Sequence, residues 1–241
     1  MMKKVFTLIL FLCISSVSFG QIYEIGFFLG GTNYIGDVGS DFYINPNRVG
    51  GGVVFKYNVN PRIALRGNFT YIPLLGDDAR SDNSFRRERN FRFSNNVFEL
   101  AAGVEFNFFD YQNKAKENLQ HTPYILAQVA VFNYNTIGNL VDNFSDGNLD
   151  LSTSNFDNNY SVTLPVGIGY KGRLGRNVAY AIESGIRFTV VDELDFTTDE
   201  FVGTPAGDQL DFEGNGNDFY VFTGFSLVYT FGRPPCYAPL D

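Results

Sequence analysis

The sequence contains no tryptophan, one histidine, two methionines and two cysteines. Cys13 and Cys236 form no CxxC pair, and a single histidine excludes HExxH and every other paired-histidine metal site. Serine and cysteine nucleophiles need a positioned base, and the only histidine, His121, lies in a short connection between expected strands. We therefore expect no enzyme, no cofactor and no metal site.

The sequence has only one long apolar run, at 5–17. Lys3 and Lys4 precede this run, and the small residues Ser18 and Gly20 follow it, a pattern typical of a secretory signal peptide. The run is too short for a membrane helix, which needs about 20 residues. We expect a signal peptide at 1–20 and a mature chain from Gln21, and any later membrane segment must then be a strand.

The composition favours strands and argues against a nucleic-acid partner. The chain has 26 phenylalanines, 14 tyrosines and 25 glycines, which is typical of aromatic-rich β-structure. Its net charge is −8, and removal of Lys3 and Lys4 makes it −8 − 2 = −10. A protein this acidic is expected to repel nucleic acid.

Eight stretches have the length and composition of strands, and seven of them alternate between large apolar side chains and small or polar ones, as half-buried strands do. The clearest has Leu65, Phe69 and Tyr71 on one face and Arg66 and Asn68 on the other. One stretch, 123–133, has apolar residues on both faces, so its orientation stays open. The expected strands are 22–33, 49–57, 62–72, 96–108, 123–133, 160–171, 178–190 and 218–231.

The connections between these strands alternate between long and short. The long ones are 34–47, 73–93, 135–159 and 191–217, and the short ones are 58–61, 110–121 and 172–177. Short turns at one rim and long loops at the other are typical of an outer-membrane barrel, whereas a soluble sandwich has no reason to sort its loops in this way. We predict an all-β fold: an eight-stranded antiparallel transmembrane barrel at 21–232, with short periplasmic turns and long external loops.

Charged residues lie on the faces that such a barrel turns inward. A soluble lipocalin-type barrel instead buries apolar groups inside. Unpaired charge inside a protein is costly, and eight strands leave a lumen that side chains can fill, so we expect a plugged, salt-bridged interior rather than a pore. The expected lumen network is Glu24, Lys56, Arg66, Glu99, Glu105, Lys171, Glu183 and Arg187.

Two external loops carry clustered charge, and we interpret both as solvated loops. Loop 73–93 has five arginines, which could also bind lipopolysaccharide phosphates or an acidic partner. Loop 191–217 is acidic and has oxygen ligands for Ca²⁺, but its spacing matches no standard calcium loop.

The tail 233–241 carries the only cysteine of the mature chain. In an exported protein an odd cysteine indicates either an intermolecular bridge or a free thiol. Two prolines stiffen the tail, and both ends of an even-stranded barrel emerge at the periplasmic rim. We expect either a docking site for another protein or an incidental exposed thiol at Arg233, Pro234, Pro235, Cys236 and Tyr237.

The signal peptide, the opening YEIGFFLGGTNYIGDV, the strand NNVFELAAGVEFNFFDY with its following PYI, and the Phe-rich closing strand resemble one family. They are similar to the PorG-like, DUF6089-type small outer-membrane barrels of Bacteroidota, over essentially the whole mature chain. This resemblance implies an outer-membrane component of the type IX protein secretion and gliding machinery. It also implies partners: a periplasmic ring lipoprotein and its partner subunit, which the barrel would anchor to the outer-membrane lipid.

On that resemblance, the tail and the short turns are the expected contact surface, with a disulfide through Cys236 as our hypothesis. No nucleic acid or small-molecule substrate is expected. The alternative is a generic small outer-membrane barrel, similar to OmpA or OmpX, with a structural role or a ligand at its external loops. A third reading, a narrow channel, predicts conductance that depends on Arg66, Glu99 and Glu105.

Overall fold

The computed structural model describes residues 22–39, 42, 44–111, 121–137, 144–145, 148–149, 156–175, 177–191, 194–195, 202–203, 209–210 and 218–232. The expected signal peptide at 1–20, most of the short connection 110–121 and the tail 233–241 lie outside these residues. Among the described residues, no helix is long and apolar enough to cross a membrane.

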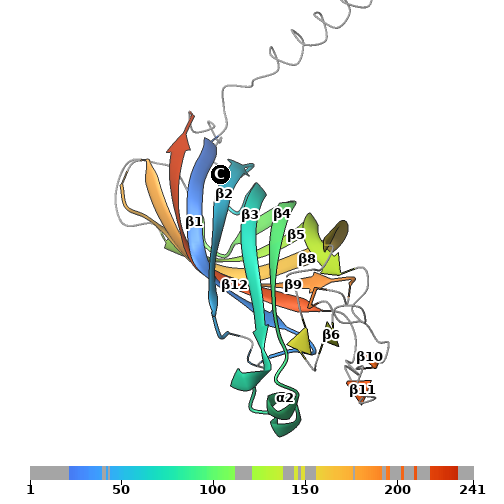
Figure 1. Cartoon of the computed structure of the whole chain (residues 1–241). Coiled ribbons are helices and arrows are strands. Elements are labelled where there is room, and N and C mark those ends of the chain that lie inside the picture. Colours follow the sequence, from blue (N-terminus) through green and yellow to red (C-terminus); the bar gives the residue numbers. More distant parts are fainter. Residues whose placement is uncertain are drawn as a thin grey trace, which may run out of the picture.

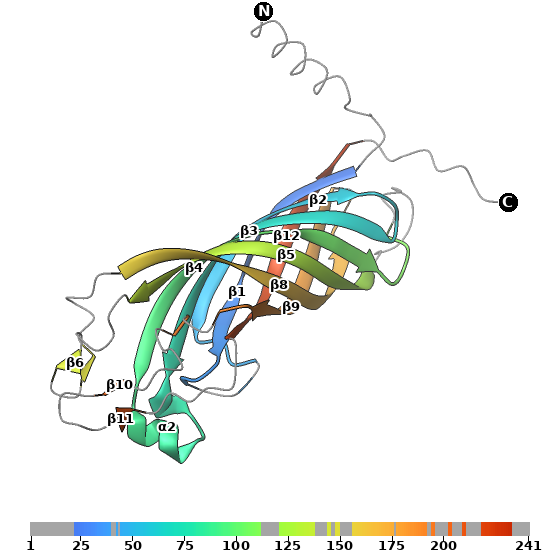
Figure 2. The ribbon, with the colours of Figure 1, turned by 90° about the vertical axis from the view of Figure 1, so that its right-hand side faces the viewer.

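Eight long strands form one closed antiparallel barrel, which confirms the predicted fold class (Figures 1 and 2). Their order around the barrel follows the sequence, and β1 closes it by pairing with both β2 and β12. The strands are β1 Ile22–Ile35, β2 Arg48–Asn58, β3 Ile63–Asp77, β4 Arg92–Asn107, β5 His121–Ile137, β8 Phe156–Arg173, β9 Val178–Thr189 and β12 Phe219–Phe231.

The chain enters and leaves the barrel at the same rim. Tyr23 near the start of β1 pairs with Phe231 at the end of β12, and the short turns lie at this rim. The 3-10 helix η1 (Asp78–Arg80) and helix α2 (Ser84–Arg89) lie at the opposite end, beyond the barrel (Figures 1 and 2). The predicted sorting of short and long connections is therefore confirmed.

The strands next to two long connections are longer than predicted. We expected 73–93 to be a loop, but β3 and β4 remain paired as far as Asp77 and Arg92. Leu74 and Phe93 are buried inside this extension, and their burial stabilises it. The extension was not predicted because polar residues around these two side chains make the segment look like a loop in the sequence. Likewise β5 continues to Ile137 and β8 begins at Phe156, with the two-residue pairs β6 (Phe144–Ser145)/β7 (Asn148–Leu149) and β10 (Val202–Gly203)/β11 (Gln209–Leu210) in the connections.

An apolar cluster fills the long-loop end of the barrel. In this cluster, the long-loop ends of the strands pack against Val38 of the first connection and Leu194 of the last. Buried Asp78 links two segments here, because its Oδ1 accepts a hydrogen bond from Gly39 N at 2.8 Å and its Oδ2 accepts one from Phe91 N at 3.1 Å. The external segments therefore continue the barrel core. The cluster contains Tyr34, Val38, Ile72, Leu74, Phe91, Phe93, Val97, Phe132, Tyr134, Leu194 and Tyr220.

Candidate functional site: a charged lumen, an apolar belt and an external recess

The structure places all eight predicted lumen charges on the inward faces of the barrel strands. Seven are buried, and Glu183 keeps 12% of its side chain exposed. Alternation along each strand puts these charges inside, because large apolar residues occupy the outward positions between them. The eight charges form two groups, one in the half nearer the short turns and one nearer the long loops.

Glu105 is the centre of the first group. Its Oε2 accepts from Lys56 Nζ at 2.7 Å and from Arg66 Nη1 at 3.3 Å, and its Oε1 accepts from Lys171 Nζ. Arg66 also donates through Nη1 and Nη2 to the two oxygens of Glu183. Three cations thus share two carboxylates inside the lumen, and Glu24 supplies the third negative charge directly across from Lys56 in the β1–β2 register.

Polar side chains complete this first group. Tyr124 donates to Glu183 at 2.6 Å, and Arg66 Nε donates to Asn68, whose amide nitrogen donates to Gln128 at 3.2 Å. The Tyr124 ring has room because its cross-strand neighbour is Gly169, where a Cβ would lie 2.4 Å from the ring. The group is therefore both charge-balanced and held in one arrangement.

The second group is an ion pair with a tyrosine. Glu99 Oε2 lies 3.7 Å from Arg187 Nε and accepts a hydrogen bond from Tyr220 OH at 2.8 Å. The Arg187 guanidinium also lies 5.6 Å from the centre of the Phe222 ring. Each ion thus faces an opposite charge inside the barrel, which offsets part of the cost of its burial.

Tyr111 covers the interior at the short-turn end. Its ring packs with Phe28 and Val54, and Lys171 Nζ lies 4.3 Å from the ring centre. Burial raises the pKa of its hydroxyl well above the ordinary value, and the nearby Glu24 carboxylate raises it further. Tyr111 and the apolar cluster at the long-loop end thus occupy the barrel interior toward its two rims.

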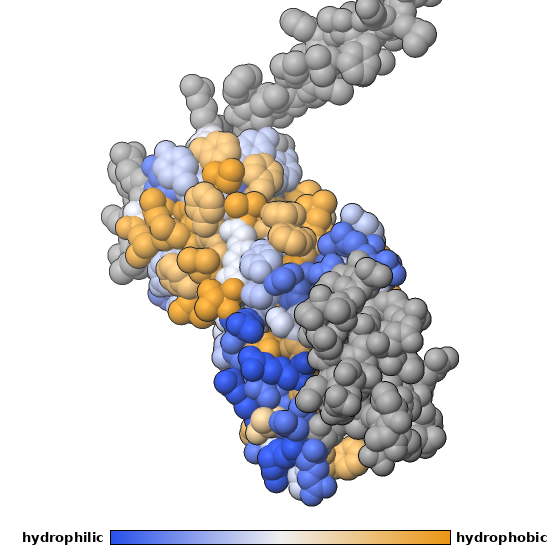
Figure 3. All heavy atoms as spheres, viewed as in Figure 1, coloured by the Kyte–Doolittle hydropathy of each residue, from blue (hydrophilic) through white to orange (hydrophobic). Residues whose placement is uncertain are grey.

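The outer wall carries an apolar belt, and Figure 3 shows it on one face of the barrel. On β4 the outward positions are apolar from Phe98 to Phe106, then become polar at Asn96, Ser94 and Arg92. Eight residue steps at about 3.4 Å and a tilt of about 40° correspond to about 20 Å across a membrane, close to the apolar height of membrane barrels. Every barrel strand contributes exposed apolar residues, for example Phe27, Val53, Leu65, Leu100, Val129, Ile168, Ile182 and Leu227.

Aromatic rings edge the belt at the short-turn rim. Tyr23 packs against Phe55, Tyr57 and Phe231, with ring centres 5.6–5.8 Å apart. At the other edge, Tyr71 packs against Phe98 and donates to Asn96 at 2.8 Å. Aromatic residues with a polar tip are typical of the level where hydrocarbon meets lipid headgroups.

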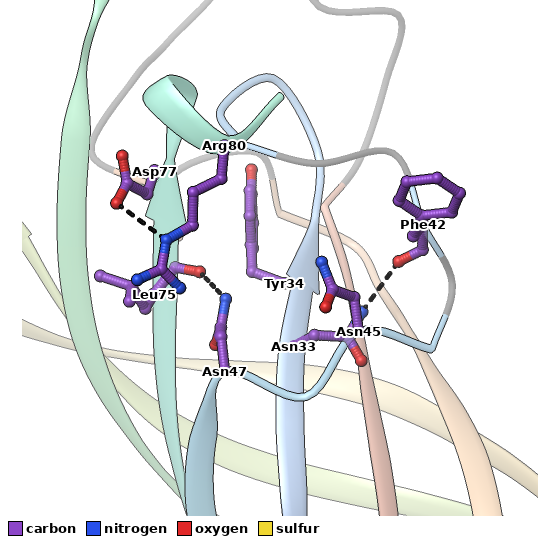
Figure 4. A pocket seen from close by; sticks show the side chains of 8 residues that line it. All are labelled: Asn33, Tyr34, Phe42, Asn45, Asn47, Leu75, Asp77 and Arg80. Carbon is purple, nitrogen blue, oxygen red and sulfur yellow. Dashed lines mark hydrogen bonds and ion pairs between the residues drawn. The ribbon is translucent and has the colours of Figure 1, made fainter. Parts of the chain in front are cut away.

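A small recess lies on the outer wall directly beyond the belt, between β1, the β1–β2 connection and β3 (Figure 4). It has a volume of about 20 Å³, enough for one water-sized group. Asn33 Nδ2 donates to Phe42 O at 3.1 Å, and Asn47 Nδ2 donates to Leu75 O at 2.9 Å. The recess is lined by Asn33, Tyr34, Phe42, Asn45, Asn47, Leu75, Asp77 and Arg80.

The sequence analysis did not identify the recess, nor Tyr111, Tyr124 and Tyr220. The inward direction of Tyr124 could not be predicted because both faces of its strand contain apolar residues. In the structure, Tyr124 is buried and Ile125 is exposed. The predicted partner-binding residues Arg233, Pro234, Pro235, Cys236 and Tyr237 lie outside the described part of the chain. The contact surface that they would form therefore stays a prediction.

Comparison with known families shows where this chain belongs. The family described as "Domain of unknown function (DUF6089)" matches residues 3–240. The chain belongs to the DUF6089 family. This confirms the DUF6089 part of the resemblance, whereas the likeness to PorG and a role in type IX secretion stay predictions. No curated protein matches this DUF6089 chain.

Several solved structures are similar to this DUF6089 protein. The N-terminal β-barrel domain of Pseudomonas aeruginosa OprF is 13% identical, with 88% of this chain and 98% of that chain covered and a TM-score of 0.46. Neisserial surface protein A is 10% identical, with 87% and 97% covered and a TM-score of 0.45. OprG, an outer membrane protein from Pseudomonas aeruginosa, is 10% identical, with 88% of this chain and 97% of that chain covered and a TM-score of 0.43.

Proposed function

We propose that this DUF6089 protein spans the outer membrane as a closed, non-enzymatic barrel and anchors a periplasmic assembly there, after export by its signal peptide. The observation that carries the membrane placement is the apolar belt. Leu100 is 65% exposed on the outer wall, whereas Glu105 on the same strand is fully buried inside. A barrel surrounded by water would show the reverse arrangement, with charged residues outside and apolar residues packed inside.

The filled lumen supports an anchor rather than a channel. The ion pairs around Glu105 and the Glu99–Arg187 pair occupy successive levels of the interior. Moving these side chains aside would leave buried charges unpaired, which costs several kcal/mol for each ion. We therefore expect the wild-type barrel to be silent in planar lipid bilayers, and discrete conductance steps would contradict this part of the proposal.

The periplasmic role rests on the family resemblance and on the position of the chain ends. Strand β12 ends at Phe231 beside Tyr23, so the tail starts from the rim with the short turns. Because the apolar belt fixes the barrel in the membrane, a periplasmic protein that binds this rim is held at the membrane surface. The type IX secretion and gliding machinery is the assembly that the resemblance implies, with the ring lipoprotein and its partner subunit as the bound proteins.

The test compares native outer membranes carrying wild-type protein with membranes carrying Cys236→Ser, on non-reducing gels. We expect a reducible band that contains the barrel and a ring subunit, identified by mass spectrometry, and we expect the variant to lack it. A gentle pull-down without reductant detects non-covalent contact in the variant. If both forms run as monomers and retain no ring subunit, the anchor role is refuted and the generic small-barrel function replaces it.

A further inference from the structure

We propose that the open edge of strand β8, at the long-loop end of the barrel, binds an extended segment of another protein that carries Lys or Arg. The segment pairs with this edge as an added strand. We call the residues Phe156–Val162 the β8 edge. The inference goes beyond the proposed anchor role, because it concerns the end of the barrel opposite the periplasmic rim.

Strand β8 continues beyond the end of its neighbour β9. The pairing of β8 with β9 begins at Thr163, which lies opposite Thr189. The pairing of β8 with β5 continues to Phe156, which lies opposite Ile137. The paired ends of β5 and β8 therefore extend beyond the adjoining wall (Figure 2). Within the described part of the chain, the β8 edge is paired with one strand instead of two.

The chain after β9 turns into the barrel end instead of following the β8 edge. Val191 O accepts a hydrogen bond from Asp218 N at 3.0 Å. Leu194 N donates to Asp218 Oδ2 at 2.9 Å, and Leu194 O accepts from Asn95 Nδ2 at 2.9 Å. Leu194 also belongs to the buried apolar cluster. Because Val191 and Leu194 are held there, the described part of this connection does not cover the β8 edge.

The backbone groups of alternate residues in the β8 edge point away from β5. At the other end of the strand, Leu174 N donates to Val178 O of β9 at 2.9 Å. Backbone direction alternates along a strand, so the even-numbered residues of β8 direct N–H and C=O toward the β9 side. Asn159 O, on an odd-numbered residue, accepts from Asn133 Nδ2 of β5 at 3.2 Å, as this alternation requires. The residues that present backbone groups to the open side are Phe156, Asn158, Tyr160 and Val162.

The opposite edge of the same hairpin is closed by a side chain. Asn135 N donates to Asn95 Oδ1 at 3.2 Å, and Asn95 Nδ2 donates to Asn135 O at 2.9 Å. Among the described residues, the side-chain hydrogen bonds of the β8 edge instead all join it to β5. Open edges are commonly protected by lysine, proline or a bulge, but the β8 edge has neither lysine nor proline and keeps a regular register with β5. It is therefore a template for strand addition.

Charge near the β8 edge favours a cationic segment. Connection 138–155, which leads into β8, has three aspartates, and connection 191–217, which follows β9, has eight acidic residues. Neither connection contains Lys, Arg or His. Asp157 adds an exposed carboxylate on the edge itself. Opposite charge speeds the encounter with a partner, and like charge rejects acidic segments.

The side chains of the β8 edge favour a segment with alternating apolar residues. Tyr160 is 74% exposed and Val162 is 47% exposed, and both lie on the outward face of the strand. Apolar side chains on one face of an added strand would pack beside them as cross-strand neighbours. The segment that fits is therefore extended, apolar on one face and cationic on the other.

The test uses the full mature barrel in zwitterionic detergent and a labelled nonapeptide in which valine and lysine alternate. A comparison peptide has glutamate in place of every lysine. We expect fluorescence anisotropy to give at least about fivefold tighter binding of the lysine peptide at low salt, with a smaller difference at about 0.5 M salt. Hydrogen exchange at Asn158 and Tyr160 should be fast in the free barrel and at least about tenfold slower with the lysine peptide bound.

Two N-methylated forms of the lysine peptide test backbone pairing on the unchanged barrel. Methyl groups on the valine amides block one edge of the peptide, and methyl groups on the lysine amides block the other. Strand addition needs only the edge that faces β8, so one form should bind like the parent peptide and the other at least about tenfold more weakly. Equal binding of the two forms would overturn the proposal.

A variant pair tests the same backbone groups from the side of the barrel. Asn158→Pro removes an N–H from the open side and leaves the pairing with β5 intact, so the lysine peptide should bind at least about tenfold more weakly. Asn158→Ala removes the same side chain but keeps the N–H, and it should bind within about twofold of wild type. The mobility of both variants on unboiled gels checks that they fold, and the N-methylated peptides decide the question if Asn158→Pro does not.

Three further results would overturn the proposal. Slow exchange at Asn158 and Tyr160 in the free monomeric barrel would mean that the edge is already covered. Slow exchange that appears only as the barrel dimerises with rising concentration would identify a second copy of this chain as the occupant. Tighter binding of the glutamate peptide, or unchanged binding by folded Asn158→Pro, would exclude the cationic added strand.

Discussion

Lys56 on β2 and Glu105 on β4 meet inside the barrel, with Nζ 2.7 Å from Oε2, although β3 separates their strands. Their strands are two spacings apart, about 9–10 Å, and the long side chains of Lys56 and Glu105 bridge this distance over the inner face of β3. Lys171 reaches the same carboxylate from β8. Glu105 therefore ties together three parts of the wall through the lumen.

Replacement of Glu105 with Gln should destabilise the barrel by about 3–5 kcal/mol, because Lys56, Arg66 and Lys171 would lose a shared carboxylate in a buried site. The measurement is the urea midpoint of the barrel in vesicles, followed by far-ultraviolet circular dichroism. The matched control removes the exposed Arg62–Asp110 pair, whose side chains are 54% and 55% exposed. Asp110→Asn should cost less than about 1 kcal/mol, and equal effects of the two changes would contradict the buried network.

An arginine in the belt should be far more costly than one beyond it. Leu100 and Ser94 are both outward on β4, but only Leu100 faces the expected hydrocarbon. Leu100→Arg should destabilise the barrel in vesicles by about 2–4 kcal/mol, and Ser94→Arg by about 0–1 kcal/mol. Urea titration in vesicles measures both. A small effect of Leu100→Arg would mean that the belt does not face lipid.

Gly169→Val should disturb the lumen without adding or removing charge. A Cβ at this position would lie 2.4 Å from the Tyr124 ring, so the ring must move and its hydrogen bond to Glu183 is weakened. We expect a loss of about 1–3 kcal/mol in the free energy of unfolding. Gly67→Ala is the control, since a Cβ there meets only Ala101 O at 3.8 Å. Unchanged stability of Gly169→Val would contradict the described position of Tyr124.

Tyr111 should make the barrel sensitive to alkali. Its pKa is raised in the folded protein by burial, so above about pH 10 the unfolded chain loses this proton while the folded chain keeps it. Stability is then fully present below pH 10 and falls as the pH rises further. Tyr111→Phe should flatten the fall between pH 10 and pH 11.5 in urea titrations. It should cost little at pH 8, because the buried hydroxyl has no hydrogen-bond partner among the described residues.

The eight barrel strands could be predicted because a membrane barrel repeats one simple pattern. Leu65, Phe69 and Tyr71 alternate with Arg66 and Asn68, and this period of two indicates a strand with different surroundings on its two faces. The alternation of long and short connections then indicates that the barrel begins and ends at the rim with the short turns. The charges of the lumen followed from the same alternation, because each ion has a large apolar residue on at least one side of it in the sequence, and five of the eight have one on both sides.

The partners of those charges could not be predicted. Nothing in the sequence relates Glu105 to Lys56, Arg66 and Lys171 rather than to any other cation, since the register between strands and the curvature of the wall bring them together. The orientation of β5 could not be predicted either, because it too depends on the tertiary structure. Tyr124 and Ile125 are both apolar enough for either face, and only closure of the barrel turns Tyr124 inward toward Glu183.

The sequence by itself thus determined strand number, the alternating faces and the end at which the chain enters and leaves, since these follow from local periodicity and connection length. The tertiary structure decided which charges pair, where β3 and β4 end and where the recess forms. Asn33, Asn47 and Asp77 are polar loop or strand residues in the sequence. They become one site only because β1 and β3 flank the β1–β2 connection at the edge of the apolar belt.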